Sequence, residues 1–343
     1  MRNMKKWISI LIAFAMLATT LCPVLAHGEV ESYDDTIGIN SEAAGFGIEG
    51  TAYGIDEVGG HNDDSSGGEA GIAYEIEEMR DAQSKTFMLD DGQLQTVVYA
   101  SPVHYLEEGE GGVELGQDGR GQQRGGGKRG RWRQIDNTIV PAEKSTERGR
   151  YSLKNNANFF SAHFGDTGEG KYAVLLEFGG NEFAFNPVTE NGAKPKQMKG
   201  AGRRKAAPAE FAAAIPESDT VIYEKAYDGA DLTYTVSENA VKEYIVINEH
   251  TGVSEFQFEI CAPGAKLGYG GDGCPVFTYG GDASVSVAGF FAFDAKGAFT
   301  EEGQVRHTLE QQGGGQYLLT VTLDEGYITD PGGRSRSTST RRS

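Results

Sequence analysis

The chain has 343 residues, of which 38% are apolar and 49 are glycine, and its 50 acidic and 31 basic residues give a net charge of −19. This acidic balance argues against nucleic acid and anionic membrane surfaces as partners, because both bind proteins through a basic face. The chain is long enough for two folded units, each with a core of its own.

The N-terminus has the pattern of a secretory signal peptide. A basic start at residues 2–6 precedes an apolar run from Trp7 to Leu21, and Val24-Leu25-Ala26 supplies a small-residue cleavage site. The apolar run is shorter than the roughly 20 residues that a membrane-spanning helix needs. We therefore expect cleavage after Ala26, a secreted or cell-surface location, and no membrane span in the mature chain.

Residues 27–80 are rich in Asp, Glu and Gly and show no apolar period. Such a segment cannot bury enough apolar surface to offset its chain entropy, so we expect a disordered acidic linker. A processed propeptide and a cation-collecting surface remain open as alternatives for the same residues.

From Lys85 onward, short alternating segments and turn residues predict an all-β fold. We expect two antiparallel β-sandwich-like units, residues 81–190 with a Gly/Arg-rich insertion at 116–131, and residues 217–330. A basic, Ala-rich linker at 191–216 separates them, and a disordered tail covers 331–343. The expected strands are 85–89, 94–100, 132–136, 158–164, 172–178, 182–185, 230–236, 241–247, 254–260, 265–269, 275–279, 284–293, 305–309 and 316–322.

The segment Tyr227–Glu249 is the clearest hairpin. Leu232, Tyr234 and Val236 alternate with Thr233 and Thr235 in its first strand, and Val241, Ile245 and Ile247 keep the same period in its second strand. Ser237, Glu238 and Asn239 provide the turn. A hairpin with one apolar face is not stable alone, so it must belong to a larger layered structure.

This hairpin resembles the second block of the N-terminal β region of secreted Rhs/YD-repeat proteins of Gram-positive bacteria, the wall-associated, DNRLRE-type family. Ser84–Tyr105 followed by Trp132–Ile139 resembles the first block of that region, and Asn155–Gly165 resembles its Asn-rich lead into a Phe-containing strand. Asn248–Ile260 and Leu323–Pro331 follow in the order that the family uses. These motifs indicate β modules and not an active site.

The resemblance implies a non-enzymatic scaffold or attachment part at the head of a longer protein. Members of the family continue into YD repeats that form a shell and into a variable C-terminal toxin. Here Thr329-Asp330-Pro331 leads into RSRSTSTRRS, where the family has a Tyr-Pro-Val and Ile-Asp-Pro strand. We expect a truncated chain whose partner is its missing C-terminal part or a cell-wall polysaccharide.

Few residues indicate chemistry, and we expect no enzyme activity, no cofactor and no metal. The six histidines lack the paired spacing of zinc ligands. His163 with Asp166 and Ser161 is better explained as a strand end and a turn than as a catalytic group. A weak calcium site would have Asp228, Asp231 and Asp272 as oxygen donors.

The sequence also draws attention to two cysteines and one tryptophan. Cys261 and Cys274 remain after signal cleavage, and they either form a disulfide or stay free. Trp132, beside a polar loop, is the one binding candidate, for an alternative function as a stand-alone glycan-binding module. A hydrolase, the third class that we considered, lacks a recognisable catalytic constellation.

Overall fold

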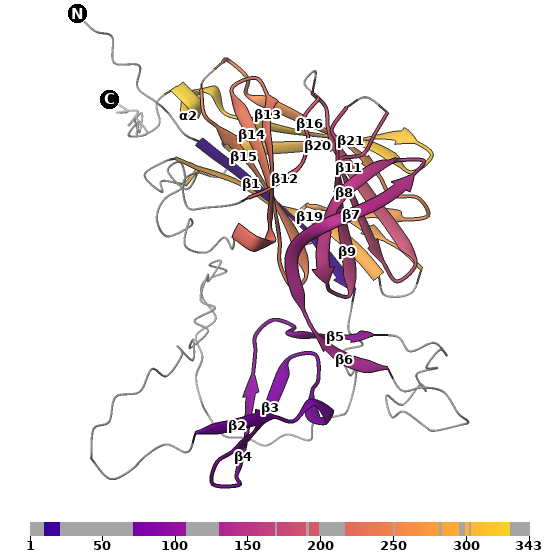
Figure 1. Cartoon of the computed structure of the whole chain (residues 1–343). Helices are drawn as coiled ribbons and strands as arrows, with labels where there is room; N and C mark the ends of the chain where they lie inside the picture. Colours follow the sequence, from indigo (N-terminus) through magenta and orange to yellow (C-terminus); the bar gives the residue numbers. More distant parts are fainter. Residues whose placement is uncertain are drawn as a thin grey trace, which may run out of the picture. The chain divides into compact units, whose positions relative to one another are not determined.

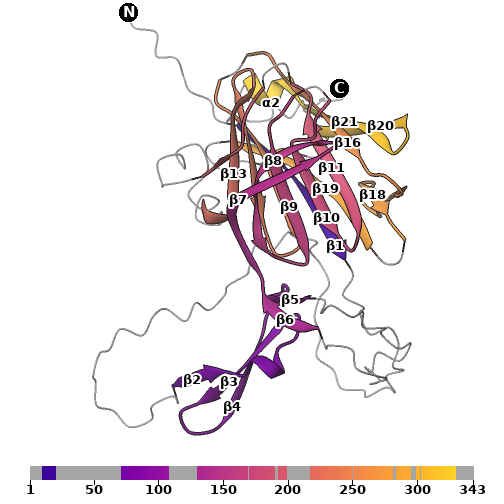
Figure 2. The ribbon, with the colours of Figure 1, turned by 45° about the vertical axis from the view of Figure 1, so that its right-hand side comes forward.

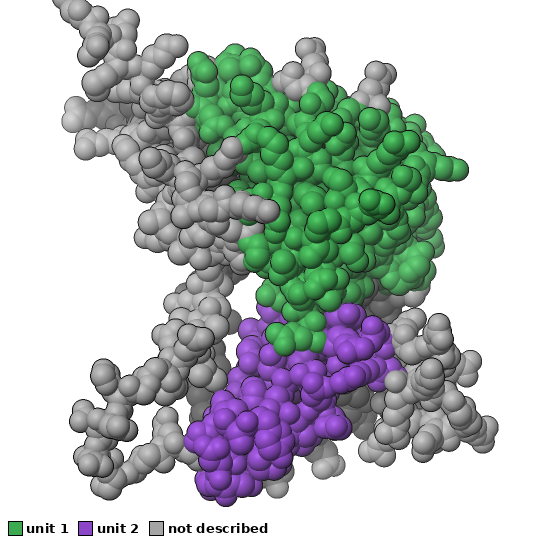
Figure 3. All heavy atoms as spheres, in the orientation of Figure 1, with its two compact units in different colours: residues 1–21, 134–343 green, residues 22–133 purple. Residues whose placement is uncertain are grey.

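The structure is a computed structural model that describes residues 10–20, 71–107, 130–168, 170–189, 192–198, 217–249, 251–280, 283–294, 299–301 and 303–329. Most of these residues lie in strands, which confirms the all-β fold class. The chain divides into two compact units, residues 1–21 with 134–343 and residues 22–133 (Figure 3).

The first sheet of the larger unit has eight antiparallel strands in the order β12-β13-β14-β15-β1-β19-β18-β17 (Figure 1). The 3-10 turn η3 (Glu217–Asp219) leads into β13. The strands are β1 (Ile10–Thr20), β12 (Lys196–Gln197), β13 (Thr220–Tyr227), β14 (Ala230–Val236), β15 (Ala240–Ile247), β17 (Lys266–Tyr269), β18 (Pro275–Thr278) and β19 (Ala283–Asp294).

The second sheet of this unit also has eight strands, in the order β20-β21-β16-β11-β10-β9-β8-β7. The short helix α2 (Glu325–Thr329) follows its last strand in sequence. The strands are β7 (Asp136–Thr146), β8 (Gly149–Ala157), β9 (Phe160–Gly165), β10 (Val174–Phe178), β11 (Asn181–Pro187), β16 (Glu255–Cys261), β20 (Val305–Gly313) and β21 (Gln316–Leu323).

The predicted hairpin is present as β14 and β15. Leu232 pairs with Ile245, and Ser237 donates its N–H to the Ala240 carbonyl at 2.8 Å to close the turn. The predicted apolar face is buried in the core. Thr233 and Thr235, on the opposite face of the strand, are also only 5% exposed, so this hairpin is covered on both sides.

Strands of both sheets of the larger unit can be followed in Figure 2, and both sheets contribute residues to one apolar core. Phe183 of β11 meets Phe277 of β18 edge to face with ring centroids 5.3 Å apart, and such pairs add to the gain from burial. Tyr223 of β13 donates its hydroxyl to the carbonyls of Gly165 and Ala173 at 2.9 and 3.2 Å, which joins the two sheets by hydrogen bonds as well. Each fully buried aromatic ring contributes about 1.5–3 kcal/mol of transfer free energy.

The smaller unit contains a three-stranded sheet of order β2-β3-β4 and a two-stranded sheet of β5 and β6. The turn η1 (Glu77–Met79) connects β2 to β3. The strands are β2 (Ile72–Glu75), β3 (Ser84–Leu89), β4 (Leu94–Val98), β5 (His104–Glu107) and β6 (Arg131–Gln134).

The structure divides the chain at a different place from the predicted boundaries. Strands β7–β11 from the predicted unit 81–190 and strands β16, β20 and β21 from the predicted unit 217–330 share one sheet. The connection is direct, since Phe185 of β11 pairs with Ile260 of β16. Alternating apolar faces on both halves need a common partner layer, so the halves form one core instead of two.

Two predicted segments contain structure. Residues 71–80, placed in the acidic linker, include β2 and η1, and residues 196–197, placed in the second linker, form β12. The rest of the acidic linker (27–70), most of the Gly/Arg-rich insertion, residues 199–216 and the tail lie outside the described residues.

Strand β1 lies within the predicted signal peptide. It pairs with β15 on one side and with β19 on the other, antiparallel to both. A segment that was expected to serve only in export is thus an interior strand of the first sheet in this structure.

Candidate functional site

A cluster of polar side chains lies on the outer face of the second sheet, on the neighbouring strands β9 and β10 and on β7, which is separated from β9 by β8. Side chains alternate along a strand, so Phe164 and Leu176 point into the core. Their neighbours His163 and Glu177 lie on the opposite face, where Lys144 of β7 joins them. We call these three residues the outer-face triad.

The triad is held by short polar contacts. Glu177 accepts hydrogen bonds from Lys144 Nζ, which lies 2.6 Å from each carboxylate oxygen, and from His163 Nε2 at 2.8 Å. The imidazole is nearly buried, whereas the Lys144 and Glu177 side chains are each 30% exposed. Glu177 therefore links one exposed cation to one buried ring.

Burial and hydrogen bonding set the charge states of the triad. Burial lowers the pKa of His163 below its ordinary value, although the bond to Glu177 acts against this. Burial alone would raise the pKa of Glu177, but hydrogen bonds from Lys144 and His163 bring that pKa below its ordinary value. At neutral pH the ring is therefore neutral, with the proton on Nε2, and Nδ1 is a buried acceptor without a partner among the described residues.

A second polar group lies on the same face. Arg148 pairs with Glu182 of β11, and a hydrogen bond with Cys261 raises the pKa of Arg148. Burial raises the pKa of Tyr151 and of Tyr172 to about 12, so both phenols stay protonated. This group places an ion pair beside two protonated tyrosines, of which Tyr151 is buried and Tyr172 partly buried.

Ser161 shares the outer face with His163 and stands directly opposite Glu177, whereas the thiol of Cys261 lies far from His163. His163, Leu175, Ala184 and Cys261 form one row across β9, β10, β11 and β16. Three strand spacings, about 14 Å, separate the imidazole strand from Cys261, too far for proton transfer. The imidazole bonds to Glu177 and not to Asp166. The sequence offered no signal for the triad, because His163 and Glu177 are brought together only by strand pairing.

The two cysteines are buried free thiols, so the disulfide left open by the sequence is not formed in this structure. Cys261 ends β16 in the second sheet, while Cys274 precedes β18 in the first sheet. Burial, together with a hydrogen bond to Asp272, raises the pKa of Cys274 to about 11.

Trp132 lies on β6 of the smaller unit and is only partly exposed. It stands between Arg131 and Arg133, which pair with Glu77 and Glu107 respectively. Other aromatic side chains are more open: Tyr74 is 58% exposed and Tyr269 is 62% exposed. The sequence analysis did not identify these two exposed rings, since the exposure of a side chain depends on which strands pack over it.

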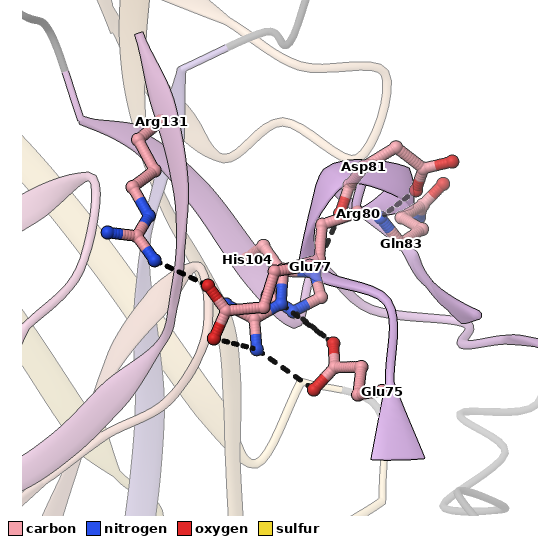
Figure 4. A network of polar contacts seen from close by, with 7 residues as sticks. All are labelled: Glu75, Glu77, Arg80, Asp81, Gln83, His104 and Arg131. Carbon is pink, nitrogen blue, oxygen red and sulfur yellow. Dashed lines mark hydrogen bonds and ion pairs between the residues drawn. The ribbon is translucent and has the colours of Figure 1, made fainter. Parts of the chain in front are cut away.

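A network of charges joins β2, η1, β5 and β6 of the smaller unit (Figure 4). Arg80 donates to both oxygens of Glu75 at 2.7 and 2.9 Å, and this bond holds the pKa of Glu75 below its ordinary value. His104 is completely buried there, with Nδ1 2.8 Å from the Asp81 carbonyl and Nε2 3.7 Å from Glu75. The network stabilises a small sheet that has little apolar core.

Two aspartates of the acidic turns accept hydrogen bonds from nearby groups and so stabilise the turns themselves. Asp231 accepts hydrogen bonds from the Lys225 N–H at 2.7 Å and the Asn248 side chain at 3.0 Å, and Asp272 accepts from the Cys274 N–H at 3.0 Å. Asp228, Asp231 and Asp272 do not gather in one place, and no group of three or more metal-ligand side chains occurs in the described part of the chain.

Comparisons with known proteins found no matching family model, no matching curated protein and no matching solved structure. Among the described helices, none has the length and apolar character to cross a membrane.

Proposed function

We propose that this chain is an exported, non-enzymatic β module that serves as the scaffold or attachment head of a larger surface protein of the Rhs/YD-repeat kind. The signal-peptide pattern supports export, and the order of the β motifs supports the family. The two-sheet unit supports a scaffold role, because many of its aromatic residues are packed inside one core.

The proposal rests on one observation: the polar side chains of the outer-face triad are hydrogen-bonded to one another. Lys144, Glu177 and His163 bond to one another, and the neutral imidazole is pinned by Glu177. A general base needs access to a substrate proton within about 3 Å, whereas this ring is nearly buried. The triad thus links β7, β9 and β10 of one sheet, which supports a structural role for these groups.

Fractionation of the producing cells tests this proposal. We expect the protein outside the cytoplasm, with His27 as its first residue by intact mass. A cytoplasmic chain that begins at Met1 would overturn the export part. Attachment is then measured as retention on purified cell wall, before and after removal of wall polysaccharide.

Glycan binding is the second candidate function, favoured by the position of Trp132 on the β5–β6 ribbon between two arginines. Trp132→Ala should abolish retention on wall polysaccharide if the ring stacks on sugar. Tyr269→Ala, which removes a more exposed ring of the other unit, is the matched control. Equal retention of both variants would exclude Trp132 as a binding residue.

A further inference from the structure

The most unusual feature of the first sheet is the origin of its central strand. β1 runs between β15 and β19 (Figure 1), with register pairs from Ile10↔Ile247 to Leu17↔Ala240 on one side and from Ile10↔Asp294 to Thr20↔Ala283 on the other. Every other strand of this sheet comes from residues after 195. The sheet is therefore completed by a segment that precedes the rest of it by more than 170 positions.

Removal of β1 would leave two facing strand edges about two strand spacings, or 9–10 Å, apart. The N–H and C=O groups on both edges would lose their partners, and unpaired buried backbone groups are strongly unfavourable. The core would also open, because Val241 and Ile245 of β15 and Val285 and Val287 of β19 are fully buried. A vacant slot of this kind is a template for another strand.

The predicted cleavage after Ala26 would cut off the whole of β1. We propose that the slot between β15 and β19 is a strand-acceptor site, which after loss of the leader takes an extended apolar segment from a partner polypeptide. This inference rests on the proposed export and cleavage. In the uncut chain, the leader segment occupies this slot.

The chemistry of the occupant follows from β1 itself. The segment ILIAFAMLATT carries no charge and no proline, spans 11 residues, and runs antiparallel to both neighbours. A partner segment must match it in length and direction, since main-chain bonds to two edges supply the affinity in strand addition. One irregularity is tolerated, because the pairing with β19 shifts between Ala13 and Ala15.

Glu243 gives the slot a means of selecting its occupant. The occupant residue at the register position of Phe14 stands opposite Glu243, and directly paired residues share one side of a sheet. Both carboxyl oxygens of Glu243 are buried, and the hydroxyl of the facing Tyr234 lies near them without forming a hydrogen bond of ordinary geometry in the described residues. A partner with Gln, Ser or Thr at this position would offer the carboxyl a donor and should bind more tightly than one with Phe.

The test uses the full chain with a site-specific protease sequence inserted between Ala26 and His27. The folded protein is cut and purified without denaturant, and its mass shows whether residues 1–26 remain. A fluorescent peptide ILIAFAMLATT with terminal lysines is then titrated by anisotropy. The matched control peptide carries Ala13→Pro and Met16→Pro, which remove two N–H donors, and a third peptide carries Phe14→Gln.

We expect saturable binding of the first peptide, at least tenfold weaker binding of the proline peptide, and tighter binding of the Phe14→Gln peptide. Hydrogen exchange should slow in β15 and β19 when the peptide binds, with no change in β10 and β11. Retention of the cut 1–26 fragment as a separate chain also supports strand acceptance. If the 1–26 fragment dissociates and no peptide binds, the proposal is overturned. This holds whether the amides of β15 and β19 exchange quickly or the two strands pair with each other.

The export assay separates the two proposals. A natural product that begins at Met1 contradicts export and cleavage, while the peptide titration still reports on the slot. A natural product that begins at His27 but binds no peptide rejects the slot and leaves export intact.

Discussion

Glu243 of β15 lies directly opposite Tyr234 of β14, and both side chains are completely buried in the core of the larger unit. Burial raises the pKa of Glu243 well above its ordinary value, and the nearby Tyr234 hydroxyl offsets this only in part. Burial thus favours the neutral form of this carboxylic acid in the folded chain.

This acid makes stability depend on pH in an unusual direction. Below the unfolded-state pKa of 4.5, the Glu243 carboxyl is protonated in both the folded and the unfolded chain, so its burial causes no pH-dependent loss of stability there. As pH rises above that value, only the unfolded chain ionises, and the free energy of unfolding falls by up to about 1.4 kcal/mol per pH unit until the folded pKa is reached. Glu243→Gln should remove this slope in urea unfolding between pH 5 and 8.

Glu249→Gln, which alters an exposed carboxyl after the same strand, is the matched control for Glu243 and should keep the slope. An identical pH dependence of wild type and Glu243→Gln would mean that the buried carboxyl is ionised in the folded chain.

The outer-face triad should contribute modestly and with the opposite pH sense. The pKa of Glu177 is lowered in the folded state, so its stabilisation is present above the unfolded value of 4.5 and disappears as pH falls through the folded value. A double-mutant cycle of Glu177→Gln and Lys144→Met should give a coupling of about 1 kcal/mol or less at pH 7, because both side chains are partly exposed. The coupling should vanish at pH 3; a value that persists there would argue against an ionic origin.

The Arg80–Glu75 ion pair should stabilise the fold of the smaller unit against local unfolding. Arg80→Met leaves Glu75 without its bidentate donor in a largely buried place, at a cost of about 1–3 kcal/mol. We expect faster proteolysis within residues 71–107 and no change in β9–β11. Arg133→Met, which breaks a more exposed pair with Glu107, is the control and should leave the cleavage rate unchanged.

The cysteines should behave as slow, separate thiols. Because burial raises the pKa of Cys274 to about 11, little thiolate exists at pH 8, and alkylation by iodoacetamide should be slow until the chain is unfolded. Mass analysis of unreduced peptides should give Cys261 and Cys274 unlinked. A peptide pair joined through these residues would show that the oxidised protein adopts a different local structure.

Local patterns were sufficient for most of the fold class. The alternation of Leu232, Tyr234 and Val236 predicted β14 because side chains on a strand point to opposite faces in turn. The same reasoning missed β7 and β8, since their strands are rich in polar residues and half exposed. The same reasoning could not predict that Thr233 and Thr235 are buried, because the burial of the second face of a strand depends on what packs against it in the tertiary structure.

Local sequence was sufficient for the net charge and for the short alternating strands, and it contains a signal-peptide pattern, since each of these features depends on neighbouring residues. Tertiary structure alone decided that the two predicted halves share a core, that His163 meets Glu177, that Glu243 is buried, and that β1 completes the first sheet. Hydrogen bonding between strands depends on the registry of segments far apart in the chain, and no local period encodes which edges will meet.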